Sequence, residues 1–247
     1  MSVYEYLMKR IGEEVFVHAA LFDPERTMPE KVGRAAEILE YTDLFLVGGS
    51  LRIYPSLLDE TIKAIKEVTD KPVVLFPGNV HVISKYADAI FFMSLLNSNN
   101  PYWITQAQAI AAPYIKEIGI ETISVAYLIV EPGGAVGWVG NANLIPRKKP
   151  EIAMLYSLAA QYFGFKFTYL EGGSGIAEPI PKEFVRFVAS NIDIPLIVGG
   201  GIRKLGHFKR MIEAGAKIIV TGSIVEKDPE RVNLIVKEAK TFAKSLQ

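Results

Sequence analysis

Three glycine-rich segments carry the clearest chemical signal in the sequence. They read YLEGGSG at 169–175, GGGIR at 199–203 and TGS at 221–223. Glycine lets the backbone approach a ligand closely and lets successive amide groups point the same way, which suits a phosphate. One glycine alone more often serves a tight turn. Three such segments in one chain favour a phosphate site, with the candidates Gly172, Gly173, Gly175, Gly199, Gly200, Gly201 and Gly222.

A second candidate site combines a carboxylate with a hydroxyl. Asp23 ends the apolar run 15–23, and Ser50 ends the segment GGS at 48–50. Together they would hold Mg²⁺, which proteins commonly bind through one or two carboxylates and substrate phosphates. The alternative is that Asp23 caps the turn at Pro24. The chain has no cysteine, so thiolate metal sites and cysteine nucleophiles are excluded.

Glu171 lies inside the first glycine-rich segment, two residues after Tyr169. A carboxylate among phosphate-binding amides repels the anion unless it has a chemical task. Acting as general base on a substrate hydroxyl is such a task. The alternative is a structural ion pair with a lysine or arginine of the fold.

The strands and helices that must position these residues can be predicted, because segments with a strand pattern alternate with segments that have a helical period. Short β-branched or aromatic runs alternate with helical patterns, and they are nearly continuous in apolar residues, as strands covered on both faces are. Eight such units predict a (β/α)8 TIM barrel, an α/β fold, as one domain over residues 1–247; a doubly wound sheet is the alternative. The expected strands are 15–23, 44–49, 73–77, 89–96, 122–130, 166–172, 195–201 and 217–222.

In this fold the active site lies at the carboxyl ends of the strands, where all the candidate residues fall. The connection between the third and fourth strands is too short to hold a full helix. Only residues 78–88 separate the third strand from the fourth, and a crossover with its helix needs at least about 10–12 residues. We expect the helix between strands 3 and 4 to be lost or reduced, which would open a cleft in the barrel wall.

The helical patterns show apolar stripes. One runs from Leu57 to Val68, a second from Met154 to Phe163 and a third from Val232 to Ala243. Stripes of this kind are typical of helices that pack through one face.

Charge and hydropathy exclude several classes of protein. The 27 basic and 27 acidic residues cancel, which argues against a nucleic-acid partner. No apolar run is long enough to span a bilayer, and the first 14 residues carry charges where a signal peptide needs apolar ones. We therefore expect a cytoplasmic protein with at most a loose membrane association, because no amphipathic basic helix stands out.

The motifs together resemble the family of geranylgeranylglyceryl phosphate synthases, archaeal prenyltransferases of ether-lipid synthesis that are grouped with PcrB-like proteins. The resemblance rests on Asp23-Pro24, on GGS at 48–50 and on the three glycine-rich segments, in the family's order along nearly the whole chain. It implies transfer of a geranylgeranyl group from geranylgeranyl diphosphate to the 3-hydroxyl of sn-glycerol 1-phosphate, with Mg²⁺ as cofactor.

The resemblance also implies roles for individual residues. Asp23 and Ser50 would bind the Mg²⁺. As a physical hypothesis of the mechanism, Glu171 is the catalytic base that takes the proton of the acceptor hydroxyl, and Tyr169 helps to orient that hydroxyl. The prenyl tail would lie in the cleft left by the missing helix. The residues expected to bind sn-glycerol 1-phosphate are Tyr169, Leu170, Glu171, Gly172, Gly173, Ser174, Gly175, Gly200, Gly201, Gly222 and Ser223.

Three alternatives remain at this stage. A relative could use the longer heptaprenyl diphosphate, because the residues that floor the cleft, with Tyr102 and Trp103 as candidates, are not evident from sequence. A sugar-phosphate isomerase or aldolase would share the glycines but would often use a lysine, which no strand end offers. A non-catalytic barrel would not need the set of Asp23, Ser50 and Glu171. Family members form dimers or hexamers, so a homo-oligomer is expected.

Overall fold

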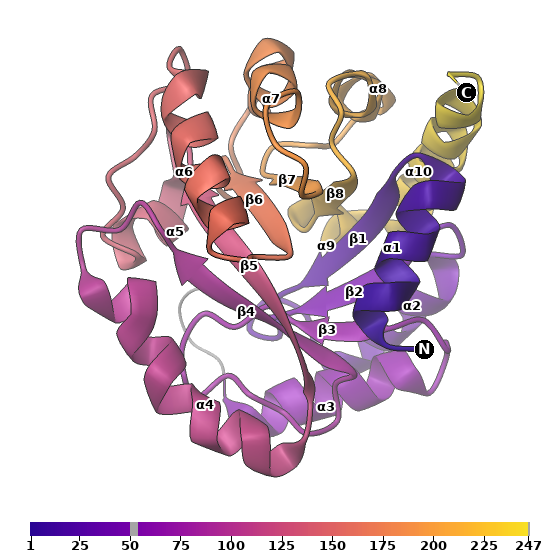
Figure 1. Ribbon diagram of the computed structural model, residues 1–247. Helices are drawn as coiled ribbons and strands as arrows, with labels where there is room; N and C mark the ends of the chain where they lie inside the picture. Colours follow the sequence, from indigo (N-terminus) through magenta and orange to yellow (C-terminus); the bar gives the residue numbers. More distant parts are fainter. Residues whose placement is uncertain (50–53, 247) are drawn as a thin grey trace.

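The computed structural model describes residues 1–49 and 54–246, and its centre is a closed barrel of eight parallel strands. Consecutive strands pair with each other, and β8 pairs with β1, so the sheet has no free edge (Figure 1). The predicted TIM barrel is thereby confirmed, and the doubly wound sheet is excluded. The strands are β1 (Val17–Phe22), β2 (Leu44–Val47), β3 (Val73–Leu75), β4 (Ala89–Leu95), β5 (Glu121–Ile129), β6 (Phe167–Glu171), β7 (Leu196–Gly199) and β8 (Ile218–Thr221).

The strands are mostly apolar because each one has two buried faces. Along β2, Leu44 and Leu46 belong to the core inside the barrel, whereas Phe45 and Val47 belong to the core under the helices. Side chains of a strand point alternately to the two faces, so a continuous apolar run fills both cores.

Helices surround the barrel, and proline marks the start of several. Pro29 and Pro229 are the first residues of α2 and α10, where their fixed φ fits and no amide donor is needed. Pro181 precedes α7 by one residue. The helices are α1 (Val3–Glu14), α2 (Pro29–Ile38), α3 (Pro55–Lys66), the π-helix η1 (Tyr102–Gln106), α4 (Ala107–Ile118), α5 (Gly134–Val139), α6 (Pro150–Tyr162), α7 (Lys182–Ala189), α8 (Leu205–Glu213), α9 (Ser223–Lys227) and α10 (Pro229–Lys244).

The connection from β3 to β4 contains no helix, as its length predicted. Residues 76–88 form turns and irregular backbone, all within the described part of the chain. Val82, Ile83 and Ala87 still pack into the outer core. The segment therefore covers part of the barrel wall although it forms no helix. In the ring of helices, α4 therefore follows α3 (Figure 1).

The apolar stripe of α6 differs from the pattern on the other helices. The fully buried residues of α6 are small, namely Ala153, Ser157 and Ala160, while Ile152, Met154 and Tyr156 pack against the outer core and stay partly exposed. Leu155 and Tyr162, at 62% and 79% exposure, face away from it instead. Small side chains occupy the buried face of α6, and Leu155 and Tyr162 on the opposite side are left on the surface.

The N-terminal helix α1 covers the amino end of the barrel. Ser2 and Glu5 form a capping box at its start, a signal that is visible in the sequence. The Val3 amide donates to Glu121 at the start of β5, and the Tyr4 ring packs against Phe167 at the start of β6. The substrate site must therefore open at the opposite, carboxyl end. No helix among the described residues is long and apolar enough to cross a membrane.

Candidate active site

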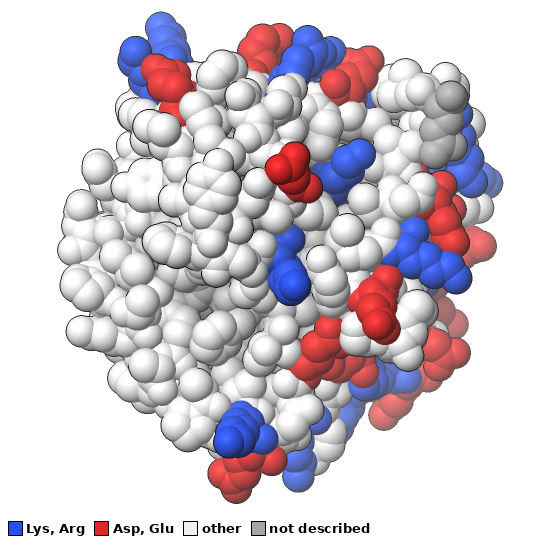
Figure 2. Space-filling model, in the orientation of Figure 1, with Lys and Arg blue, Asp and Glu red and all other residues white. Residues whose placement is uncertain are grey.

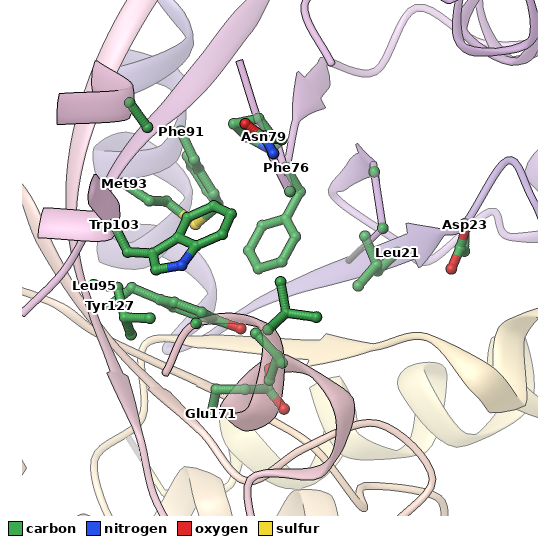
Figure 3. Close-up of a pocket in the computed structure, with 18 of the residues that line it drawn as sticks. Leu21, Asp23, Phe76, Asn79, Phe91, Met93, Leu95, Trp103, Tyr127 and Glu171 are labelled. Atoms are coloured by element: carbon green, nitrogen blue, oxygen red, sulfur yellow. The ribbon is translucent and has the colours of Figure 1, made fainter. Parts of the chain in front are cut away.

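A pocket lies at the carboxyl ends of the strands and continues along the barrel wall. Figure 3 shows Asp23 at one end of it, Trp103 and Met93 at the other, and Phe76 between them. Glu171 lies on one side of this path. The pocket thus joins a region with charged groups to a long apolar region.

The loops after β6 and β8 line the charged end of the pocket through Ser174, Gly222 and Ser223, and the loop after β7 packs against the loop after β6. The Gly172 amide donates to the Gly199 carbonyl oxygen at 3.1 Å, which joins two of the loops. At Gly200, φ is +90°, and an added Cβ would lie 2.9 Å from the Gly173 nitrogen and from a Glu171 oxygen. Only glycine fits there. Within the described residues, the amides of Gly200 and Gly201 donate to no acceptor, and neither residue is part of the pocket lining.

The other predicted phosphate-binding residues differ in their access to the pocket. Ser174, Gly222 and Ser223 line it, whereas Gly175 is an exposed residue of the same loop as Ser174. Leu170 points into the outer core under the helices, so only its backbone faces toward the site region.

Glu171 is buried, at 7% exposure, yet it lines the pocket. Its Oε1 accepts a 2.6 Å hydrogen bond from the Gly173 amide. Burial raises the pKa of this carboxyl above its usual value, although the Gly173 amide and the hydroxyls of Tyr169 and Tyr127 act in the opposite direction. A higher pKa makes Glu171 a stronger base once it is ionised.

Two tyrosines flank Glu171. Tyr127 on β5 and Tyr169 on β6 are paired in register, and their rings meet edge to face with centroids 5.0 Å apart. Burial and the nearby Glu171 raise the pKa of both phenols well above its usual value, so both stay protonated. The Tyr169 hydroxyl is fully buried and has no hydrogen bond of good geometry among the described residues. Sequence reasoning identified Tyr169 but missed Tyr127.

Asp23 lies next to a second carboxylate that sequence reasoning missed. Glu226, on α9, accepts a 3.0 Å hydrogen bond from the Asp23 amide through Oε1, and both side chains line the pocket. Burial is the main cause of a raised pKa for each carboxyl. Arg26 lies 3.2 Å from Asp23, measured from Nε to Oδ2. Ser50, the other predicted metal ligand, lies outside the described residues.

The donors at this end of the pocket fit a hard cation such as Mg²⁺. Asp23 offers carboxylate oxygens, and a Cβ on Gly49 would lie 2.7 Å from its carboxyl carbon, so glycine keeps that side of the carboxylate open. No group of three or more His, Cys, Asp or Glu residues in the described ranges forms a complete metal cage. A site with few protein ligands is typical of Mg²⁺ that shares substrate phosphates.

The apolar region of the pocket follows the β3–β4 connection, where the helix is missing. It runs between that segment and helix α4, and it is lined by side chains from both and from β4. Trp103 projects into it from the π-helix next to Met93 and Phe76 (Figure 3). The apolar residues that line it are Phe76, Val80, Ile83, Phe91, Met93, Leu95, Trp103, Ala107, Ala111 and Ile115.

A closed parallel barrel with free loop amides, a buried carboxylate and an apolar extension defines an α/β-barrel enzyme that handles a phosphate together with a long apolar group. The PcrB family matches residues 9–240, and the chain therefore belongs to this family.

Relatives and solved structures agree with that placement. Geranylgeranylglyceryl phosphate synthase of Pyrococcus abyssi is 52% identical over 227 residues, which are 91% of this chain and 90% of the relative. The crystal structure of (S)-3-O-geranylgeranylglyceryl phosphate synthase from Thermoplasma acidophilum, in complex with its substrate sn-glycerol-1-phosphate, superposes with a TM-score of 0.91 at 43% identity. The superposition covers 96% of this chain and 99% of that one.

A likeness to an aldolase is limited to the fold. The aldolase YdjI of Escherichia coli K12 has a TM-score of 0.56 at 14% identity, over 99% of this chain and 96% of that one. The isomerase or aldolase alternative therefore gains nothing beyond a shared barrel.

Proposed function

We propose that this protein is a prenyltransferase that joins the geranylgeranyl group of geranylgeranyl diphosphate to the 3-hydroxyl of sn-glycerol 1-phosphate. The products are 3-O-geranylgeranylglyceryl phosphate and diphosphate. Support comes from the family, from relatives that carry this activity in their names and from the related structure that holds sn-glycerol 1-phosphate.

One observation carries the proposal most directly. A single pocket runs from Asp23, past Glu171, into an apolar region beside the missing helix. A sugar-phosphate isomerase would need the polar part but not the apolar part. A prenyl donor needs both, because its diphosphate and its tail occupy opposite ends of one molecule.

The acceptor would lie at the glycine loops. The free amides of Gly200 and Gly201, together with the Ser174 and Ser223 hydroxyls, would hold the phosphate group. This would fix the glycerol so that its 3-hydroxyl faces Glu171, and positioning of this kind is a large part of catalysis.

The chemistry then needs one bond made and one broken. The 3-oxygen of the glycerol forms a bond to the first carbon of the prenyl chain, while the bond from that carbon to the diphosphate oxygen breaks. Glu171 takes the hydroxyl proton, and the diphosphate leaves with the bonding electrons. The protonated phenols of Tyr127 and Tyr169 would favour the ionised form of the Glu171 carboxylate.

Mg²⁺ would bind at Asp23, with Ser50 as the second expected ligand. When bound, the ion supplies positive charge that stabilises the departing diphosphate. We expect Asp23→Asn and treatment with EDTA to remove turnover. Added Mg²⁺ should restore turnover only to the EDTA-treated enzyme, which is checked by titrating Mg²⁺ back into each sample.

The decisive experiment is a product assay with a series of prenyl diphosphates. The protein is incubated with Mg²⁺, sn-glycerol 1-phosphate and donors from ten to thirty-five carbons, and products are identified by mass spectrometry. We expect the twenty-carbon donor to give the highest kcat/KM. A preference for the thirty-five-carbon donor would establish the heptaprenyl alternative, and no product with any donor would refute prenyl transfer.

We further propose that the enzyme acts in the cytoplasm as a homo-oligomer. The outward apolar stripe of α6 supports the assembly, because Tyr162 and Phe163 are 79% and 77% exposed in the isolated chain.

A further inference from the structure

The charged end of the pocket is poor in positive charge. Three carboxylates line it, on Asp23, Glu171 and Glu226. Among the described residues, Arg26 is the one lysine or arginine in the lining. Yet both substrates of the proposed reaction are phosphorylated, so the pocket must accept two anionic groups beside three carboxylates. The contacts of Arg26 therefore matter for the binding of these anionic groups.

Arg26 extends across the mouth of the barrel. Its Nε is 3.2 Å from Oδ2 of Asp23, just after β1. Its Nη1 is 3.4 Å from the Oγ of Ser174, in the loop after β6. These strands are not neighbours in the barrel. One guanidinium thus touches both the carboxylate expected at the diphosphate and the loop expected at the glycerol phosphate.

We propose that Arg26 binds both anionic groups at once, the diphosphate of the donor and the phosphate of the acceptor. This inference rests on the proposed function and adds a substrate-binding residue to it. A guanidinium has five donors in a planar fork that matches phosphate oxygens. The two contacts in the structure are long, and the side chain is 47% exposed, so its remaining donors can reach a ligand.

A shared cation couples the two substrates. Two anions that bind close together repel each other, and a cation between them offsets that repulsion. With Arg26 present, diphosphate therefore disturbs the binding of sn-glycerol 1-phosphate little or improves it. Without Arg26, the repulsion remains and each anion weakens the binding of the other. If Arg26 only held the Asp23 side chain in place, the binding of one anion would not depend on the other in this way.

The test is calorimetric and needs no turnover. sn-Glycerol 1-phosphate is titrated into the protein in Mg²⁺ buffer, with and without saturating inorganic pyrophosphate as the donor's stand-in. The variants are Arg26→Gln, which removes the charge, and Arg26→Lys, which keeps it. Arg34→Gln is the matched control, because Arg34 is an exposed residue of α2 with no ion pair among the described residues.

We expect Arg26→Gln to raise the Kd for sn-glycerol 1-phosphate about tenfold without pyrophosphate and further with it. Arg26→Lys should recover part of the loss, and Arg34→Gln should behave as wild type. If pyrophosphate changes the Kd by the same factor in Arg26→Gln and wild type, Arg26 is not shared and the inference is wrong. Wild-type prenyl transfer is assayed on the same preparation, because its absence would refute the proposed function and not the binding role of Arg26.

Discussion

Glu171 shows how one residue can combine burial with access to substrate. The carboxyl is almost covered by protein, which raises its pKa, but it still lines the pocket. Two protonated phenols and one backbone amide surround it and favour its ionised form. Burial is the larger influence, so the pKa of Glu171 is raised and its carboxylate is a stronger base than an exposed one.

The role of Glu171 predicts a specific kinetic defect. Glu171→Gln keeps the size of the side chain but cannot take a proton, so we expect kcat to fall by about 10²–10⁴-fold. The Kd for sn-glycerol 1-phosphate should change far less, as measured by calorimetry. Unchanged near-ultraviolet circular dichroism would show an intact fold, and a kcat close to that of wild type would refute the assignment.

His18 gives a second prediction, on stability. It lies fully buried within β1, and its two ring nitrogens contact the hydroxyls of Thr42 and Thr221 at 2.9 and 2.8 Å. Burial lowers its pKa to about 3. In the unfolded chain the pKa is about 6.5, so between these values the unfolded state binds more protons. The stability that neutral His18 supports is present above pH 6.5 and is lost as the pH falls.

The size of this effect can be measured against a variant. From pH 7 to pH 5, protonation of His18 in the unfolded state should lower the free energy of unfolding by about 2 kcal/mol. His18→Gln keeps a polar side chain but does not titrate, so its stability should fall by that much less over the same interval. Urea unfolding at both pH values provides the measurement, and equal losses in the two proteins would contradict it.

Sequence alone located much of the candidate site because the fold determines where strand ends meet. Asp23, Glu171 and the glycine loops could be placed at one rim once eight strands were counted. Tyr127 was missed because it lies inside a continuous apolar strand, where nothing in the sequence tells which face a residue takes. Arg26 and Glu226 were missed because their contacts are with residues that lie far away in the sequence.

At the scale of elements, the missing helix is the feature that turns a common barrel into one with a long apolar pocket. The short connection between β3 and β4 leaves part of the wall covered by irregular chain, and α4 forms the far side of the pocket. Filling that pocket from α4 should therefore affect long donors and spare short ones.

Ala111 and Ala112 allow this to be tested on adjacent residues of α4. Ala111 is buried and lines the pocket, whereas Ala112 is exposed. We expect Ala111→Phe to lower kcat/KM for the twenty-carbon donor at least about tenfold and to affect a ten-carbon donor much less, because only the longer tail meets the new ring. Ala112→Phe should leave both values unchanged. Equal losses with both donors would show that the tail lies elsewhere.

The elements were predictable where period and spacing were strong, and less so elsewhere. All eight strands and the missing helix followed from apolar runs and from the length of residues 78–88. The π-helix at Tyr102–Gln106 has no sequence signal of its own. The stripe on α6 was visible, but its outward orientation depends on Ala153 and Ala160 being the residues that fit against the strands.

At the scale of the molecule, charge is distributed unevenly although it sums to zero. One side of the surface, over α4, α5 and part of α6, has few charged residues (Figure 2). Exposed large apolar residues occur on these helices. They are Ile110, Tyr114, Trp138, Leu155 and Tyr162, with Phe163 directly after α6. Exposed apolar residues gathered on a surface with few charges commonly mark a protein interface.

If the exposed apolar residues of α6 form the interface of the proposed oligomer, a single charged side chain introduced there should disrupt the assembly. Leu155 on α6 and Leu234 on α10 are equally exposed, at 62% and 61%. We expect wild type to have a mass in solution of at least two chains of 27.3 kDa each. Leu155→Glu should shift it toward smaller species, and Leu234→Glu should not. Light scattering after gel filtration measures this, and a monomeric wild type would contradict the proposal.

The gap in the ring of helices, beside the β3–β4 connection, also determines how a long substrate can reach its place. A tunnel must be entered tip first, and its width at the entrance selects what passes. A trough along the barrel wall can be entered broadside, so a flexible chain can settle into it along its whole length at once. Selection for chain length then falls to the side chains that line the apolar region, such as Trp103 and Ala111, and not to the width of an entrance.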